Sequence, residues 1–313
     1  MMRKRIQAGF AVFVLAVTAS PVLAQNFVGL RAGGLTLTTF GADGVTGAPS
    51  AIVGLNAADT LVGIDYFSSG NGQLYGMGAS GTLYTLAIGG ATTTAAVDSG
   101  PVYSPAVAGG TTSVGMPVAI DFNPMADRLR VFSGVNNYRI TQGTGLLSND
   151  GLLAYVAGDP QTGQAPNLVA GAYINNFDAP TSTTLYSIDA SSNSLVVHSV
   201  GPQFSTITTL DELQIGGAGT PVDFLAGNTG FDVLTLGGVN TAYVSSGNTI
   251  YTTTLNAGSV GDPAGDLTLF AAVTGPGSIG GITDIAAVPE PASLVLAGLG
   301  LSGIALLYLR RRK

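Results

Sequence analysis

The chain has 313 residues, no cysteine, one histidine and a formal net charge of −7, and only 9% of its residues are charged. Without cysteine, disulfides and thiolate metal sites are excluded, and the scarcity of bases argues against nucleic-acid binding. Hydrophobic residues make up 46%, and the 46 glycines follow no strict period, which favours many short strands joined by tight turns.

The N-terminus has the three parts of a secretory signal peptide in order. These are the bases Arg3-Lys4-Arg5, an apolar run from Phe10 to Val17, and the small-residue site Val22-Leu23-Ala24. We therefore expect signal peptidase to cut after Ala24, so that residues 1–24 are removed. An uncleaved membrane anchor is the alternative.

The body of the chain is acidic. Between the two basic ends only four bases remain, all arginines, against 18 acids when Glu290 is counted. An exported body with this charge tolerates salt and attracts divalent cations weakly.

Segments of five to eight residues rich in Val, Ile, Leu, Tyr and Thr alternate with clusters of Gly, Asn, Asp and Ser, which predicts an all-β body. One kind of segment recurs at intervals of 51 to 61 residues. Further strands are expected after each of the first four copies, such as Gln73–Met77 and Thr82–Leu86 after the first. The five copies are Leu61–Tyr66, Pro117–Phe122, Val169–Ile174, Gly230–Leu234 and Gly281–Ile285.

The two ends of the body complete one another. The strands expected at Phe27–Leu30, Gly34–Thr38 and Ala51–Val53 have no first strand before them, and Gly281–Ile285 has no strand after it. We therefore predict that residues 25–287 form a β-propeller of five four-stranded blades, closed by N- and C-terminal strands. Six blades or a two-sheet sandwich are the alternatives. The connections 99–116, 145–167 and 256–265 are predicted to be loops.

Aspartates occupy related places in four of the five recurring segments, and the third copy lacks one. If the first strand of each blade lines a central channel, these carboxylates form a ring that can bind Ca²⁺, which takes six to eight oxygen ligands. In the alternative interpretation, each aspartate ends a strand and binds turn amides. The four residues are Asp65, Asp121, Asp232 and Asp284.

A second polar cluster lies in the second copy and holds three of the body's four arginines when Arg139 is included. Its arginines can grip a carboxylate or an acidic sugar, or they can pair with nearby acids across a hairpin. The candidate ligand-binding residues are Asp121, Asn123, Asp127, Arg128 and Arg130. The lone His198, in a predicted strand, is interpreted as a surface or satisfied core residue.

The run Asp121-Phe-Asn-Pro-Met-Ala-Asp-Arg-Leu-Arg-Val131, with Asn136, Arg139 and Asp150-Gly151 after it, resembles an uncharacterised bacterial exported domain with a D-F-N-P-x-x-D-R-L-R-V pattern. The resemblance covers about Leu61 to Ala287. It implies a propeller-like β fold, and it brings no catalytic residues.

The last segment, 288–313, has three parts: Pro289-Glu290-Pro291, an uncharged apolar run from Ala292 to Leu309, and the bases Arg310, Arg311, Arg312 and Lys313. A helix over the apolar run would be about 27 Å long, enough for a bilayer core. A plain membrane anchor is one interpretation. The order resembles the PEP-CTERM sorting signal of Gram-negative bacteria, which implies cleavage near Pro289 by an exosortase.

Together these features predict a protein exported through the inner membrane, briefly anchored by its C-terminal helix, and then displayed on the cell surface or released. We expect a non-enzymatic structural or interaction role linked to exopolysaccharide or biofilm, and no cofactor beyond a candidate Ca²⁺. The alternatives are a glycan- or cation-binding propeller and, further away, a polysaccharide hydrolase or lyase, which would need paired carboxylates.

Overall fold

The computed structural model describes residues 27–41, 43–68, 72–99, 119–201, 203–215, 222–236, 238–255, 266–275 and 281–288. The expected signal peptide and the sorting segment from Pro289 onward lie outside these ranges. All regular elements within them are strands, so the predicted all-β class is confirmed. The described part of the chain contains no helix of sufficient length and apolarity to cross a membrane.

The strands form four hydrogen-bonded sheets. The first sheet has eight strands in the order β22-β1-β2-β3-β7-β6-β5-β4. Its strands are β1 (Phe27–Arg31), β2 (Thr36–Phe40), β3 (Ser50–Val53), β4 (Leu61–Phe67), β5 (Gln73–Gly78), β6 (Leu83–Ile88), β7 (Thr92–Ser99) and β22 (Ile282–Ala287). The second sheet consists of β8 (Ala119–Asn123), β9 (Arg128–Ser133), β10 (Asn136–Thr141) and β11 (Leu146–Leu152).

The third and fourth sheets have five strands each. The third contains β12 (Ala154–Tyr155), β13 (Leu168–Tyr173), β14 (Leu185–Asp189), β15 (Ser194–His198) and β16 (Thr206–Glu212). The fourth contains β17 (Gln214–Ile215), β18 (Thr229–Leu236), β19 (Val239–Ser246), β20 (Thr249–Thr254) and β21 (Asp266–Ala272).

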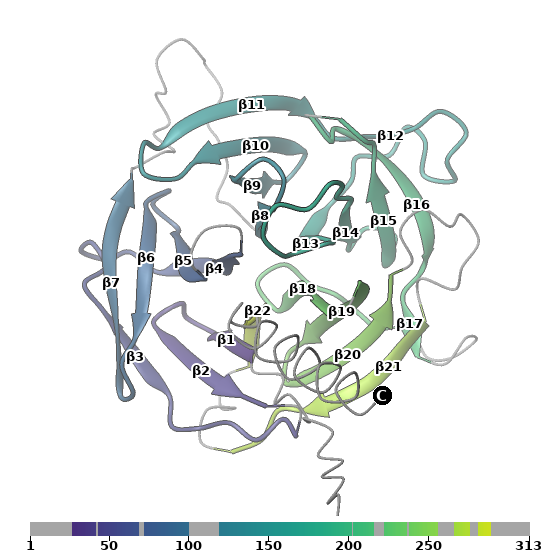
Figure 1. The fold of residues 1–313 in the computed structure, drawn as a ribbon. Coiled ribbons are helices and arrows are strands. Elements are labelled where there is room, and N and C mark those ends of the chain that lie inside the picture. Colours follow the sequence, from purple (N-terminus) through teal and green to yellow (C-terminus); the bar gives the residue numbers. More distant parts are fainter. Residues whose placement is uncertain are drawn as a thin grey trace, which may run out of the picture.

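The sheets radiate from a common axis (Figure 1). Each presents a first strand to the centre, and the eight-stranded sheet presents one at either end. We call these the inner strands, and each contacts the next around the axis in the order β22, β4, β8, β13, β18 and back to β22. Because they are packed on both sides by neighbouring sheets, they are buried almost throughout, whereas an outer strand such as β3 alternates between buried and exposed residues.

The inner strands run in one direction. A Cβ on Gly63 would lie 2.9 Å from Ile120 Cγ1, and two residues further along each strand Asp65 binds the amide of Phe122. β4 and β8 therefore run in parallel. A Cβ on Gly230 would lie 2.5 Å from Ile285 N, and Asp232 binds the amide of Ala287, so β18 and β22 do the same.

The remaining contacts complete this orientation. The N–H of Leu61, at the start of β4, donates to the carbonyl oxygen of Gly34 in the turn after β1. Because β1 is antiparallel to β22, this turn lies where β22 begins, so β4 and β22 begin on the same side. Asn175 and Asn176 follow β13 and bind side chains at the β18–β19 turn. All five inner strands therefore end on the same side of the molecule, which we call the exit rim.

The first and last described strands are neighbours, as the sequence predicts. β1 pairs antiparallel with β22, with Phe27 opposite Ala287 and Leu30 opposite Asp284. Between adjacent sheets lie clusters of apolar side chains, and one of them joins Phe27 and Phe40 to Tyr243 and Ile285 across the two chain ends. With no cysteine, the fold depends on these clusters and on the sheet hydrogen bonds.

The prediction that 145–167 is a loop is wrong, because β11 and β12 lie in it. The stretch Leu146–Leu152 contains Ser, Asn, Asp and Gly and looks like a turn region, but it pairs with β10 over most of its length. β12 pairs parallel with β16, as β3 does with β7 and β17 with β21. Of the predicted loop 99–116, Ser99 ends β7 and the rest lies outside the described residues, as does the predicted loop 256–265.

Candidate functional site: a buried carboxylate cluster

Four aspartates lie on the inner strands near the axis. Asp65 is on β4, Asp121 on β8, Asp232 on β18 and Asp284 on β22, and β13 has Ala172 at the corresponding position. Asp65, Asp121 and Asp232 are no more than 3% exposed, and one carboxylate oxygen from each lies within 4.8 Å of the others. The structure thus gathers three of the four predicted residues, while Asp284 stands beside them and is less buried.

Each of these carboxylates accepts a backbone N–H from another inner strand. Asp284 Oδ2 lies 2.8 Å from Ile64 N, and Asp65 Oδ2 lies 2.6 Å from Phe122 N. Asp121 Oδ1 lies 3.0 Å from Tyr173 N, and Asp232 Oδ2 lies 2.5 Å from Ala287 N. The expectation that they bind turn amides is therefore wrong: the aspartates lie within strands and tie neighbouring sheets together.

One link in this series is made differently. Between β13 and β18, where Ala172 offers no carboxylate, Asn175 N donates to Asn240 Oδ1 and Asn176 N donates to Thr235 Oγ1, both at 3.0 Å. At the exit rim, amide and hydroxyl oxygens thus accept backbone N–H groups from the neighbouring sheet, as carboxylates do between the other inner strands.

Burial makes these carboxylates weaker acids than usual. It raises the pKa of Asp65 and of Asp121 well above the ordinary value, and the nearby charges of other cluster aspartates add to the rise. For Asp232, burial raises the pKa to about 7, and the amides of Ala287 and Val233 partly offset the rise. Burial likewise raises the pKa of Asp284 well above its usual range. Near neutral pH the cluster therefore holds protons or favours a cation.

The second predicted cluster is divided between the core and the surface. Arg130 on β9 is 1% exposed, and its Nη1 lies 2.5 Å from Asp150 Oδ2 and 2.6 Å from Asn137 Oδ1. Its Nε lies 3.0 Å from the Tyr173 hydroxyl. This guanidinium is paired with an acid inside the protein, as in the alternative interpretation, but Asp150 lies on β11, two strands from β9, and not across a hairpin; ligand binding by Arg130 stays a prediction.

The other members lie around the β8–β9 turn. Asn123 is buried, and its Oδ1 accepts the amides of Met125 and Ala126. Asp127 is exposed with φ of 51°, and Arg128 Nη1 lies 2.8 Å from the carbonyl oxygen of Asp127. Asn123 therefore shapes the turn, and of the five predicted residues only Asp127 and Arg128 offer polar atoms at the surface.

His198 is a satisfied core residue. Its Nε2 lies 2.8 Å from Ser187 Oγ, its Nδ1 lies 2.7 Å from the Phe204 carbonyl, and its ring stacks on Phe132. Burial lowers the pKa of His198 to about 3, so the ring is neutral.

Sequence reasoning missed several partners. Asp150 neutralises Arg130, and its oxygen also lies 2.6 Å from Arg139 Nε. Asp59 accepts from Ser80 and from the Tyr84 hydroxyl, and Asp159 accepts the amide and hydroxyl of Thr209. Arg139 and Asp150 are 11 positions apart, the other contacts join residues 20 to 50 positions apart, and no local motif signals them.

An all-β body followed by a C-terminal sorting motif defines a class of protein that is sorted toward the cell surface. Residues 287–313 match the PEP-CTERM protein-sorting motif, so the predicted signal is confirmed and indicates exosortase-dependent sorting toward the cell surface. Residues 36–275 match the family described as "Domain of unknown function (DUF4394)", and the chain belongs to that family. The D-F-N-P pattern stays a prediction.

No curated protein matches the chain. Among solved structures, a protein of unknown function from Bacteroides caccae has a TM-score of 0.38 at 9% identity, covering 85% of this chain and 100% of its own. The β-propeller domain of Nup133 from Vanderwaltozyma polyspora has a TM-score of 0.37 at 8% identity, covering 78% and 69%. The allergen Mala s 1 of Malassezia sympodialis has a TM-score of 0.39 at 9% identity, covering 78% and 76%.

Proposed function

We propose that this protein is a five-bladed β-propeller that is exported, released from its C-terminal anchor by an exosortase, and displayed outside the inner membrane in a structural or interaction role. The sorting motif starts at the last residue of β22, which supports a design in which the folded body is complete before the tail begins. The blades would be β22-β1-β2-β3, β4–β7, β8–β11, β13–β16 and β18–β21.

A non-enzymatic role is favoured because the buried polar residues bind other groups of the protein. The four cluster aspartates bind backbone amides of neighbouring inner strands, and Arg130 binds Asp150 in the interior. These groups stabilise the body instead of facing a substrate. The acidic, lysine-free surface would suit a hydrated matrix such as exopolysaccharide.

Intact-mass measurement of the protein recovered from cells and from medium tests the processing. We expect a mature chain that begins at Gln25 and ends near Pro289. Recovery of only the complete chain in the inner membrane would refute it. For the role outside, deletion of the gene should alter surface composition, aggregation or biofilm; an unchanged deletion strain would count against it.

The second candidate is binding of a divalent cation, favoured by the three carboxylate oxygens within 4.8 Å of one another. Ca²⁺ would be held by Asp65, Asp121 and Asp232 and would relieve their mutual repulsion. A ligand about a hundredfold above its Kd stabilises a protein by about 2.7 kcal/mol.

Thermal unfolding at pH 8 with EDTA or with added Ca²⁺ tests this candidate. The wild type should melt higher with Ca²⁺, Asp121→Asn should lose the increase, and Asp127→Asn, an exposed acid on the adjacent turn, should retain it. Equal shifts in Asp121→Asn and the wild type would place the cation elsewhere, and no shift in the wild type would dismiss it.

A further inference from the structure

Both ends of the described body meet the exit rim. Phe27 begins β1 directly opposite Ala287, which ends β22, so the chain enters and leaves on adjacent strands, about 5 Å apart. The apolar run of the signal peptide precedes Phe27, and the apolar run of the sorting segment follows Val288. While either run is in a bilayer, the exit rim is therefore the side of the body nearest to the lipid.

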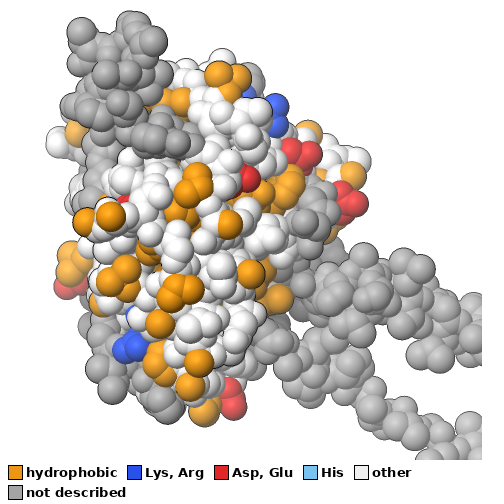
Figure 2. Space-filling model, turned by 90° about the vertical axis from the view of Figure 1, so that its left-hand side faces the viewer, with side chains coloured by type: hydrophobic (Ala, Val, Ile, Leu, Met, Phe, Trp, Pro, Cys, Tyr) orange, Lys and Arg blue, Asp and Glu red, His pale blue; other side chains and the backbone are white. Residues whose placement is uncertain are grey.

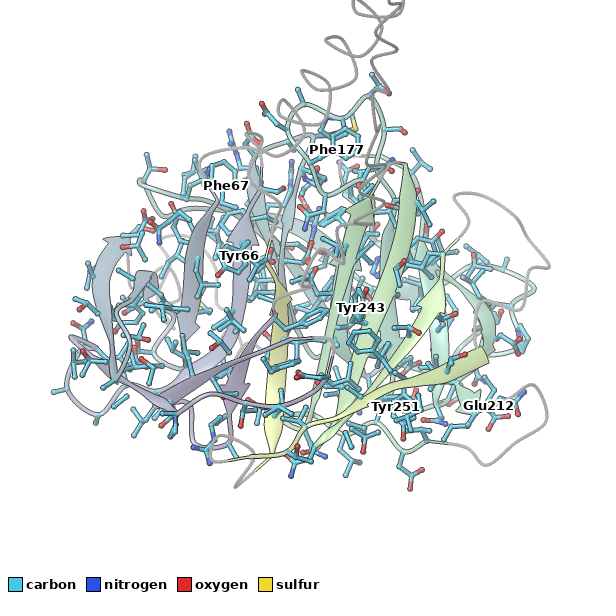
Figure 3. All side chains as sticks on the ribbon, turned by 60° about the horizontal axis from the view of Figure 1, so that its bottom comes forward. Tyr66, Phe67, Phe177, Glu212, Tyr243 and Tyr251 are labelled. Carbon is cyan, nitrogen blue, oxygen red and sulfur yellow. The ribbon has the colours of Figure 1, made fainter. Side chains whose placement is uncertain are left out.

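The exit rim also carries exposed apolar side chains. Met125 follows β8 and is 53% exposed, Phe177 follows β13 and is 45% exposed, and Val239 follows β18 and is 56% exposed. Phe67, at the end of β4, is half-buried. Figure 3 shows Phe67 and Phe177 on the same side of the ring, away from Tyr251 and Glu212. Each inner strand before β22 thus ends at or near an apolar residue.

Hydrogen bonds hold these turns in place. Asn123 Oδ1 accepts the Met125 amide at 2.9 Å, which fixes the turn after β8. Asn175 O accepts the Phe177 amide at 2.8 Å, and Asn175 also binds Asn240 beside Val239. On the part of the outer wall that Figure 2 shows, small hydrophobic groups are separated by polar ones. The rim residues differ because they surround the point where the chain leaves.

We propose that the exit rim docks on the lipid surface during sorting, with Met125, Phe177 and Val239 inserted at the membrane interface. From Val288 to the apolar run at Ala292 the chain is four residues long, about 14 Å at most. At this distance the rim is at a high effective concentration near the bilayer, so modest side-chain insertion suffices. The inference rests on the sorting motif and goes beyond the proposed function.

Charge favours a zwitterionic lipid surface. The same turns carry the exposed acids Asp127 and Asp178, with Arg128 as the neighbouring base. Anionic headgroups would repel the two carboxylates, whereas phosphatidylcholine or phosphatidylethanolamine would not. We therefore expect docking to weaken as the share of phosphatidylglycerol rises at low salt.

The chain has no cysteine, so single labelled cysteines can report its orientation. The full chain is reconstituted in phosphatidylcholine vesicles that contain spin-labelled lipid, and an environment-sensitive fluorophore is placed at Met125→Cys or Val239→Cys. The matched controls are Leu35→Cys and Leu225→Cys, which are 50% and 60% exposed and lie on the side where the inner strands begin. Rim labels should be blue-shifted and quenched, and control labels should be neither. Equal quenching at both sides, or stronger quenching at the controls, would overturn the proposal.

A second comparison separates the effect of the rim side chains from that of the tether, by which we mean the C-terminal segment that keeps the body near the bilayer. Asp127→Cys carries the label in a chain that also has Met125→Ser, Phe177→Ser and Val239→Ser. Losing half-exposed side chains of this size should shift the docked-to-free ratio by about fivefold each, so quenching should largely vanish. Leu35→Ser with Leu225→Ser should leave it unchanged. Undiminished quenching in the triple variant would show that the tether alone sets the orientation, and would overturn the proposal. None of these results depends on the role of the mature protein.

Discussion

Replacing Asp232 by asparagine should change stability in opposite directions at low and at high pH. Burial raises the pKa of Asp232 to about 7, against an ordinary value of 3.8. The folded protein therefore holds a proton there that the unfolded chain releases above about pH 4. Stability contributed by this protonated group is fully present below pH 4 and is lost as pH rises toward 7.

The magnitude follows from the size of the shift. A rise of about three pKa units corresponds to about 4 kcal/mol of penalty on the ionised form above pH 7. The asparagine side chain would have no such penalty, but it would lose one of the two amide bonds, from Val233 or Ala287, at a cost of about 1–2 kcal/mol. The variant should therefore be less stable than wild type by about 1–2 kcal/mol at pH 4 and more stable by about 2 kcal/mol at pH 8.

The assay is urea unfolding followed by circular dichroism from pH 4 to pH 8, with EDTA present. The difference between variant and wild type is the quantity to follow, because the depressed pKa of His198 gives wild-type stability an opposite slope between about pH 3 and 6.5, and this slope cancels in the difference. A difference that stays constant from pH 4 to 8 would refute the reasoning. Asp127→Asn, exposed and outside the cluster, is the control substitution.

Three further predictions concern the packed interior. Gly230→Ala places a Cβ 2.5 Å from Ile285 N, so thermal unfolding should show a loss of about 1–3 kcal/mol, whereas Gly47→Ala, with no neighbour within 3.4 Å, should be nearly neutral. Arg130→Met leaves Asp150 buried and should cost about 3–5 kcal/mol in urea unfolding, whereas Arg139→Met, 29% exposed, should cost less; equal losses would contradict the pairing. His198 should show no titration between pH 5 and 8 by nuclear magnetic resonance, because its pKa is lowered to about 3.

Much of the fold could be predicted from local pattern. Short runs of β-branched and aromatic residues between glycine- and asparagine-rich turns identify strands such as β4 and β19, because these side chains fit a pleated, half-buried surface. Leu146–Leu152 was missed because its Ser, Asn, Asp and Gly favour turns, and only pairing with β10 makes it a strand.

The candidate site could likewise be predicted only in part from the sequence. The recurrence of aspartate in four segments and its absence from the third were visible in the sequence, but only the structure shows that Ala172 stands at the corresponding position. Which amide each carboxylate binds could not be predicted, because residues 52 to 220 positions apart are brought together only by the order of sheets around the axis. The same holds for Arg130, whose partner Asp150 lies in the region expected to be a loop.

The sequence by itself determined the all-β class, the acidic lysine-free body and the C-terminal sorting motif, because each depends on residue type and order along the chain. The tertiary structure alone decided that the aspartates tie inner strands together, that Arg130 is buried, and that both chain ends leave from one rim with Met125, Phe177 and Val239 around them. These features depend on strand direction and on contacts between distant segments, which no local pattern encodes.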